Sequence, residues 1–251
     1  MTYIIGIDCA TDGTKAGLAL GHWTTEHLQL ISVEKGTRDL TQQVLKLLSQ
    51  TEDQDILLAM DAPLGWPVDL GTSLANHQAG DPIFPPANTL FRRETDRFIK
   101  KHFNKQSLDV GADRIARTAH AALHLLQVIR QKSGKSFPFR LQPKITNHSG
   151  VIEVYPAATL IAYQMPNQGY KSAGLQEHSQ KRQQIIDHLK DHMTFQCPTQ
   201  VMIDSADALD AAICVLAGAD FLNGHCYPPQ DPQSAAKESW IWTRRPLNPK
   251  N

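Results

Sequence analysis

Two short apolar runs, each ending in an aspartate, constrain the fold of this chain more than any other feature. Residues 3–8 read Tyr-Ile-Ile-Gly-Ile-Asp and residues 56–61 read Ile-Leu-Leu-Ala-Met-Asp. Such runs are typical of buried parallel strands. Ligands of α/β sheets bind at the carboxyl ends of strands, so we expect Asp8 and Asp61 to lie side by side there. A buried acid is costly unless it is paired or metal-bound, which makes both residues candidates for a functional site.

A third group of acids lies near the C-terminus, in the sequence Asp204-Ser-Ala-Asp207-Ala-Leu-Asp210. The Ala-rich sequence that follows predicts a helix over 205–221. At about 100° per residue, Asp204 and Asp210 would flank Asp207, which makes Asp207 the centre of the acidic face. Asp204 has an alternative role as a cap of the helix N-terminus.

Together these acids predict a site for hard divalent cations. Carboxylate oxygens are the ligands that Mg²⁺ prefers, and Mn²⁺ suits the same donors. We therefore expect Asp8, Asp61 and Asp207 to bind Mg²⁺ or Mn²⁺, with Asp204 or Asp210 assisting. Two ions about 4 Å apart can activate a water and stabilise a leaving oxygen in phosphodiester hydrolysis.

The order of the expected elements predicts an α/β fold of the ribonuclease H-like class, a mixed sheet flanked by helices. Three strands are expected first, over 3–9, 15–21 and 27–33, and then a helix over 40–48 and the strand that ends at Asp61. After the fourth strand comes a mostly helical insertion, about 66–148, with a Pro- and Gly-rich loop over 66–86 and helices over 89–102 and 110–132. A fifth strand over 151–155, helices over 175–193 and 205–221 and a loop-like tail from residue 228 complete a single domain, 1–251.

Composition limits the possible settings. The 25 Lys and Arg residues balance 25 Asp and Glu residues, so the net charge does not indicate a polyanion partner. The four cysteines show no paired CxxC spacing, which argues against a zinc site and fits a reducing cytosol. No apolar run approaches the roughly 18 residues of a membrane span, and no secretory signal is recognisable. We expect a cytoplasmic protein with no membrane partner.

Positive charge is concentrated in the insertion. Residues 92–105 carry six basic and two acidic side chains, and residues 130–144 carry five basic side chains and no acid. Such a patch beside an acidic metal cluster could hold the phosphate backbone of a nucleic acid, DNA or RNA. A solvated helix face is the alternative.

Six short motifs resemble, in order, those of the DUF429 family of predicted nucleases, and the resemblance runs from residue 4 to about residue 220. The motifs are Ile-Ile-Gly-Ile-Asp8-Cys-Ala with Asp12-Gly13, Met-Asp61-Ala-Pro-Leu-Gly65, Arg93-x-x-Asp96-Arg97, Glu153-Val-Tyr-Pro156, Tyr170-Lys171 and Asp207-Ala-Leu-Asp210-Ala. The resemblance implies a ribonuclease H-like fold and a metal-dependent nuclease.

The same resemblance implies roles for further residues. Those expected to contact substrate are Arg93, Asp96, Arg97 and Lys171. Glu153 lies within the fifth strand, and its position alone allows two roles: it joins the catalytic acids beside the metal, or it forms a buried ion pair with an arginine such as Arg93. The segment from Asp204 to Leu209 also resembles the acidic helix of RuvC-type junction resolvases, which favours Asp204 as the helper of Asp207, whereas the DUF429 pattern favours Asp210.

Two other classes of function remain open at this point. Residues 8–15 resemble the phosphate loop of sugar kinases and actin-like ATPases, but such a phosphotransferase would need a second domain around the nucleotide. The third possibility is a non-catalytic module that binds nucleic acid or protein through the basic insertion.

Overall fold

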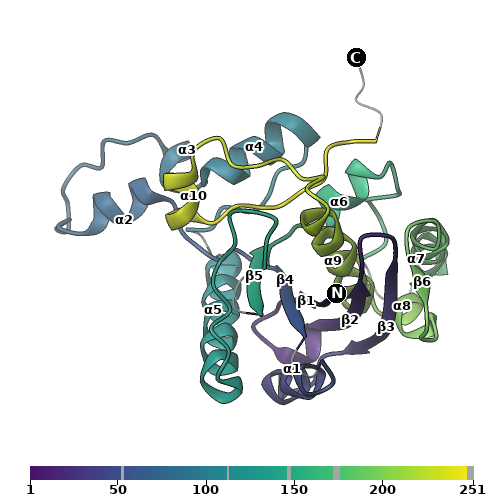
Figure 1. Ribbon diagram of the computed structural model, residues 1–251. Coiled ribbons are helices and arrows are strands. Elements are labelled where there is room, and N and C mark those ends of the chain that lie inside the picture. Colours follow the sequence, from purple (N-terminus) through teal and green to yellow (C-terminus); the bar gives the residue numbers. More distant parts are fainter. Residues whose placement is uncertain (52–53, 112, 146–147, 172–175, 248–251) are drawn as a thin grey trace.

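A six-stranded mixed sheet organises the computed structural model, which describes residues 1–51, 54–111, 113–145, 148–171 and 176–247 (Figure 1). The strand order is β5-β4-β1-β2-β3-β6. The strands are β1 (Thr2–Asp8), β2 (Gly17–Trp23), β3 (Leu28–Lys35), β4 (Asp55–Asp61), β5 (Ser149–Glu153) and β6 (Thr194–Phe195). Among the described residues, no helix is long and apolar enough to cross a membrane.

The first five strands have the arrangement expected of a ribonuclease H-like fold. β1, β2 and β3 form an antiparallel meander, while β4 runs parallel to β1 and β5 runs parallel to β4. The register of β1 and β4 places Asp8 directly opposite Asp61. The two acids therefore lie side by side at the carboxyl ends of neighbouring strands, as the sequence predicts.

Helices cover both faces of the sheet, because successive side chains of each strand point to opposite sides. On one face, Ile4 belongs to an apolar core with α9 (Ala206–Leu222). On the other face, Ile5 belongs to a core with α1 (Leu40–Ser49) and α5 (Asp113–Ser133). The long, apolar α9 packs across β1 to β4 and is buried along nearly its whole length.

The remaining helices differ in part from expectation. They are η1 (Gly13–Lys15, a 3₁₀ turn), α2 (Val68–Leu74), α3 (Ala87–Leu90), α4 (Glu94–Phe103), α6 (Pro156–Ala162), α7 (Gln176–Leu189), α8 (Gln200–Asp204) and α10 (Pro232–Glu238). α2 lies inside the loop predicted over 66–86. The helix predicted over 89–102 is divided into α3 and α4, because Arg93 adopts an extended conformation and caps α4. α8, α10 and β6 lie outside the predicted elements.

The C-terminal segment joins the insertion to the sheet. α10 packs against α2 and α4 (Figure 1). Beyond it, the backbone N–H of Ile241 donates to Thr95 in α4, and that of Trp242 donates to the carbonyl of Glu153 in β5. The tail predicted to be loop-like from residue 228 is thus partly helical and packed.

Candidate functional site

Three aspartates from distant parts of the chain meet at the carboxyl ends of β1 and β4. Asp8 and Asp61 end these strands, and Asp210 approaches them from the second turn of α9. Each offers one carboxylate oxygen, and these three atoms all lie within 4.8 Å of one another. An all-oxygen set of this kind suits Mg²⁺ or Mn²⁺.

Glycines in the strands allow α9 to come close enough to contribute its acid. A Cβ on Gly6 would lie 2.1 Å from the carbonyl oxygen of Ala211, and a Cβ on Gly17 would lie 1.9 Å from that of Asp207. Both distances are impossible for a larger residue unless the helix backbone moves. The small residues of β1 and β2 therefore set the height of α9 above the sheet.

Two residues that are adjacent to each other in sequence, Tyr170 and Lys171, contact Asp210. The Tyr170 hydroxyl donates to Oδ1 of Asp210 at 2.8 Å, and the Lys171 ammonium lies 2.7 Å from Oδ2. Burial, followed by the charge of Asp210, raises the pKa of Tyr170, so its hydroxyl stays a donor. Burial alone would lower the pKa of Lys171, but the charges of Asp210 and Asp61 outweigh it, so the lysine stays charged.

The acids repel one another in a partly desolvated setting. Burial raises the pKa of Asp8 well above its ordinary value, and Asp210 and Asp61 raise it further. Burial raises the pKa of Asp61 to about 7, with Lys171 opposing and Asp210 adding to the shift. A carboxyl whose charged form is disfavoured in this way is stabilised by an added cation.

Asp207 and Asp204 lie outside this group of three. Asp207 is half-buried one turn before Asp210, where burial and the charge of Asp210 raise its pKa. Asp204 is exposed at the end of α8 and accepts a hydrogen bond from Gln200. The helix predicted over 205–221 begins at Ala206, with Ser205 as its extended N-cap, so Asp204 is not on the same helix. The geometry favours Asp210 in the central position predicted for Asp207.

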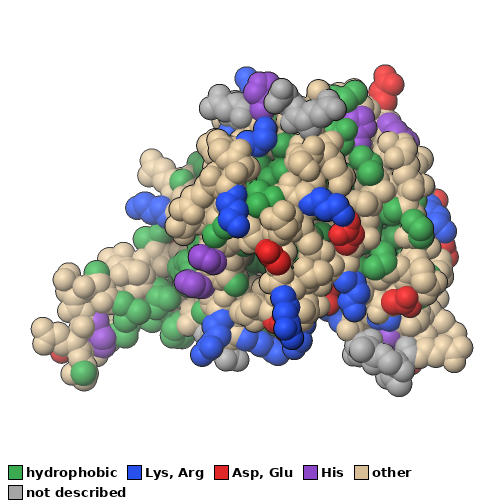
Figure 2. Space-filling view, turned by 90° about the horizontal axis from the view of Figure 1, so that it is seen from below, with side chains coloured by type: hydrophobic (Ala, Val, Ile, Leu, Met, Phe, Trp, Pro, Cys, Tyr) green, Lys and Arg blue, Asp and Glu red, His purple; other side chains and the backbone are tan. Residues whose placement is uncertain are grey.

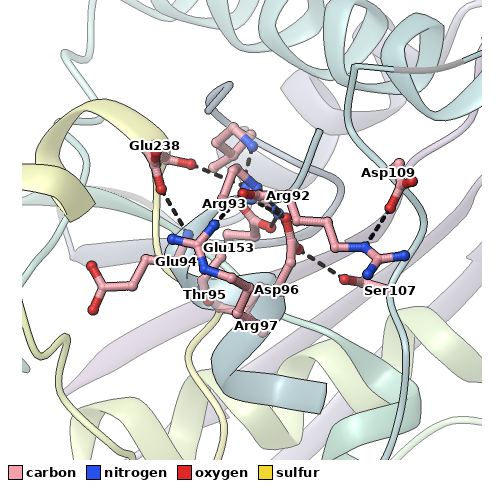
Figure 3. Close-up of polar contacts among 12 residues, drawn as sticks. Arg92, Arg93, Glu94, Thr95, Asp96, Arg97, Ser107, Asp109, Glu153 and Glu238 are labelled. Atoms are coloured by element: carbon pink, nitrogen blue, oxygen red, sulfur yellow. Dashed lines mark hydrogen bonds and ion pairs between the residues drawn. The ribbon is translucent and has the colours of Figure 1, made fainter. Parts of the chain in front are cut away.

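Glu153 forms the buried ion pair with Arg93 that was one of its two predicted roles (Figure 3). Nη1 and Nη2 of Arg93 each donate to one oxygen of Glu153 at 2.8 Å. Nε and Nη2 donate to the two oxygens of Asp96 at 3.0 Å, and Nη1 also donates to the carbonyl of Glu238. All five guanidinium N–H groups are therefore used, which favours a positioning role for Arg93 and Asp96 over direct contact with substrate.

Further contacts fix this ion pair in place. The backbone N–H of Leu64 donates to Glu153, and the Ser107 hydroxyl donates to Asp96 (Figure 3). Glu238, in α10, accepts hydrogen bonds from the backbone N–H groups of Val68 and Glu94, which links the tail to the insertion. Glu153, in β5, accepts from Arg93, which links the insertion to the sheet. No pattern in the sequence indicates the roles of Ser107 and Glu238.

A cavity of about 290 Å³ connects the aspartate cluster with the Arg93 ion pair. Its lining includes Asp8, Asp61 and Lys171 together with Arg93 and Asp96. The insertion supplies a third wall that includes Leu108, Ile115 and Thr118, and Tyr155 also lines the space. This size is close to the lower limit of the roughly 300–1,000 Å³ typical of small-ligand pockets.

Two of the basic side chains predicted to form a patch over residues 92–105, Arg92 and Arg93, form ion pairs with acids. Arg92 forms an ion pair with Asp109, Arg97 donates to the carbonyl of Arg92, and Lys100 donates to Asn104. Figure 2 shows one face of the molecule, where Lys and Arg side chains are interspersed with Asp, Glu and His. The predicted contact of Arg97 with substrate stays a prediction, as does that of Lys171.

Comparison with known proteins found one matching family and a similar solved structure. A solved structure described as T. thermophilus RuvC in complex with a Holliday junction substrate matches 86% of this chain and 97% of its own length, with 12% sequence identity and a TM-score of 0.36. No curated protein matches the chain. The sequence profile of the family described as "Protein of unknown function (DUF429)" matches residues 6–234. Since this match covers most of the sequence, the chain belongs to the DUF429 family.

Proposed function

We propose that this protein is a metal-dependent nuclease that hydrolyses phosphodiester bonds of nucleic acid with Mg²⁺ or Mn²⁺. One observation carries the proposal. Carboxylate oxygens of Asp8, Asp61 and Asp210 lie within 4.8 Å of one another at the carboxyl ends of β1 and β4. Asp207, one turn earlier on α9, is close enough to add to the negative charge. A cytoplasmic setting is part of the same proposal.

Hydrolysis adds water across the phosphodiester. The water oxygen bonds to phosphorus, the bond from phosphorus to the leaving oxygen breaks, and one proton of the water ends on that oxygen. A bound divalent cation would activate the water and stabilise the developing charge. The aspartates would hold this cation, and the Lys171 ammonium would offer a further positive charge to the phosphoryl oxygens.

The ion pair of Arg93 with Glu153 and Asp96 lines the same cavity as Asp8 and Asp61. Because Glu153 and Asp96 are both hydrogen-bonded to the same guanidinium, their carboxylates stay fixed instead of turning toward the cluster. Burial alone would lower the pKa of Arg93, but the charges of Glu153 and Asp96 raise it, so the pair stays ionised. Because the donors of Arg93 are all used by protein acceptors, we expect the reacting phosphate to contact the aspartate site and Lys171.

The contacts of the first loop do not favour the kinase-like alternative. Asp12 accepts hydrogen bonds from the backbone N–H and the hydroxyl of Thr14, so these donors are engaged within the turn. A non-catalytic binding module would have no need of three converging acids, one buried and two half-buried, whose mutual repulsion costs stability.

A cleavage assay with a matched pair of variants tests the proposal. Labelled single-stranded and duplex DNA and RNA are incubated with the full chain and Mg²⁺ or Mn²⁺. We expect hydrolysis that a chelator abolishes, that Asp210→Asn abolishes, and that Asp204→Asn retains. Absence of cleavage for every substrate, or equal loss in both variants, would contradict the proposed function or the assignment of Asp210.

A further inference from the structure

Lys171 places a cation inside the aspartate cluster without any bound metal. Its ammonium lies 2.7 Å from Oδ2 of Asp210. The Lys171 side chain is 56% exposed, whereas that of Asp210 is 2% exposed, so the lysine reaches a buried acid from the solvent side. Oδ1 of the same carboxylate accepts from Tyr170. Both oxygens of Asp210 therefore already have a partner.

The charge of this ammonium acts on the whole cluster. The ammonium contacts Asp210, one carboxylate oxygen of which lies within 4.8 Å of an oxygen of Asp8 and an oxygen of Asp61, and Lys171 lines the same cavity as Asp8 and Asp61. Lys171 is thus a shared counter-ion of the acids.

The net charge of the site limits how many divalent cations it can bind. The four aspartates Asp8, Asp61, Asp207 and Asp210 carry four negative charges when ionised, and Lys171 reduces the total to three. One divalent cation leaves one negative charge, whereas two leave an excess of positive charge in a partly buried site. The ammonium already lies 2.7 Å from Oδ2 of Asp210, so a cation that took this oxygen as a ligand would have to displace it.

We propose that, in the absence of substrate, the site binds a single divalent cation and that the Lys171 ammonium takes the place of a second one. This inference rests on the proposed function, because it assumes that the aspartates bind metal. It makes Lys171 a positioning residue that sets how many metal ions the free protein takes up.

Calorimetric titration of the full chain with Mn²⁺ tests the proposal without any assay of activity. The wild-type protein should bind one ion per chain. Lys171→Met removes the charge and should bind two, and electron paramagnetic resonance should then show a spin-coupled Mn²⁺ pair. Lys171→Arg keeps the charge and should again bind one ion.

Lys190→Met is the matched control, because Lys190 also forms an ion pair with an aspartate, at 2.9 Å, and is 50% exposed. This variant should bind one ion, like the wild type. Two ions in the wild-type protein, or one ion in Lys171→Met with unchanged affinity, would overturn the proposal. No binding by the wild-type protein would instead contradict the metal site itself, and a thermal unfolding curve for each variant confirms that it is folded.

Discussion

Arg93 and Arg92 are adjacent in sequence but lie in opposite environments. Arg93 is 1% exposed and pairs with two buried carboxylates, whereas Arg92 and its partner Asp109 are 34% and 37% exposed. Arg93→Met leaves Asp96 and Glu153 buried without their partner and should lower the free energy of unfolding by about 3–5 kcal/mol. Arg92→Met should cost at most about 1 kcal/mol, as exposed pairs usually do. Urea denaturation at pH 7 measures both, and equal losses would show that the buried ion pair is not structural.

The aspartate cluster predicts an unusual dependence of stability on pH. A carboxyl whose pKa is higher in the folded state stabilises the fold below its ordinary pKa, and this contribution is lost as the pH rises through the folded value. For Asp61 these values are 3.8 and about 7. In metal-free buffer, the free energy of unfolding should therefore fall by a few kcal/mol between pH 4 and 7, by the linkage of about 1.4 kcal/mol per pKa unit.

Comparison of variants isolates this effect. Asp61→Asn should flatten the decline in chemical denaturation curves recorded from pH 4 to pH 8. Asp187→Asn should leave it unchanged, because Asp187 lies on the surface and its hydrogen bond to Lys190 lowers its pKa. Saturating Mg²⁺ should remove the decline, since a cation that binds only the folded state stabilises it. A decline that persists in Asp61→Asn would show that other groups cause it.

Among the site residues, the sequence allowed firm placement only of those that end strands. Asp8 and Asp61 follow apolar runs, and the parallel pairing of those runs brings the two acids together. The choice among Asp204, Asp207 and Asp210 depends on where α9 begins and on its rotation over the sheet. Both are set by tertiary packing at Gly6 and Gly17, which periodicity alone does not reveal.

At the scale of elements, the contact of α9 with the sheet decides where Asp210 lies. Gly17→Ala places a Cβ against the backbone of Asp207 and should push the first turn of α9 outward. We expect a loss of about 1–3 kcal/mol in the free energy of unfolding, as for other overpacked sites, and weaker binding of Mn²⁺. Gly71→Ala in α2 is the control, because a Cβ there meets no atom within 4 Å and should be neutral or stabilising. Unchanged Mn²⁺ affinity in Gly17→Ala would show that the packing of α9 against the sheet does not control metal binding.

The elements that could be predicted are those whose own residues carry the signal. β1 and β4 are continuous apolar runs, and α9 is an uninterrupted Ala-rich stretch. β6 has only two residues and exists because it pairs with β3. The division of α3 from α4 depends on the extended backbone at Arg93, which its buried ion pairs hold in place. Such features need partners distant in sequence.

At the scale of the whole molecule, the C-terminal segment fastens the insertion to the sheet. Trp240 is fully buried, packs against Phe98 of α4 with ring centroids 5.0 Å apart, and donates to the carbonyl of Tyr227. Trp240→Ala should cost about 3–5 kcal/mol. Leu247→Ala should change little, because Leu247 is 45% exposed. Thermal unfolding compares the two, and a small effect of Trp240→Ala would mean that the insertion holds its position without the tail.

The order of the first five strands was predictable, whereas the position of β6 and the closure of the cavity were not. The order follows from the sequence of strand and helix patterns in the chain. Closure requires the tail to reach back and bind α4 and β5, through Ile241 and Trp242. Contacts between segments so far apart in sequence leave no local pattern.

Anomalous diffraction from crystals soaked in Mn²⁺ shows directly whether Asp8, Asp61 and Asp210 bind a divalent cation. We expect a manganese peak coordinated by carboxylate oxygens of Asp8, Asp61 and Asp210. The same soak of Asp210→Asn crystals should lose or weaken the peak, and that of Asp204→Asn crystals should retain it. A wild-type site without manganese, or a peak that involves Asp204 and not Asp210, would contradict the account.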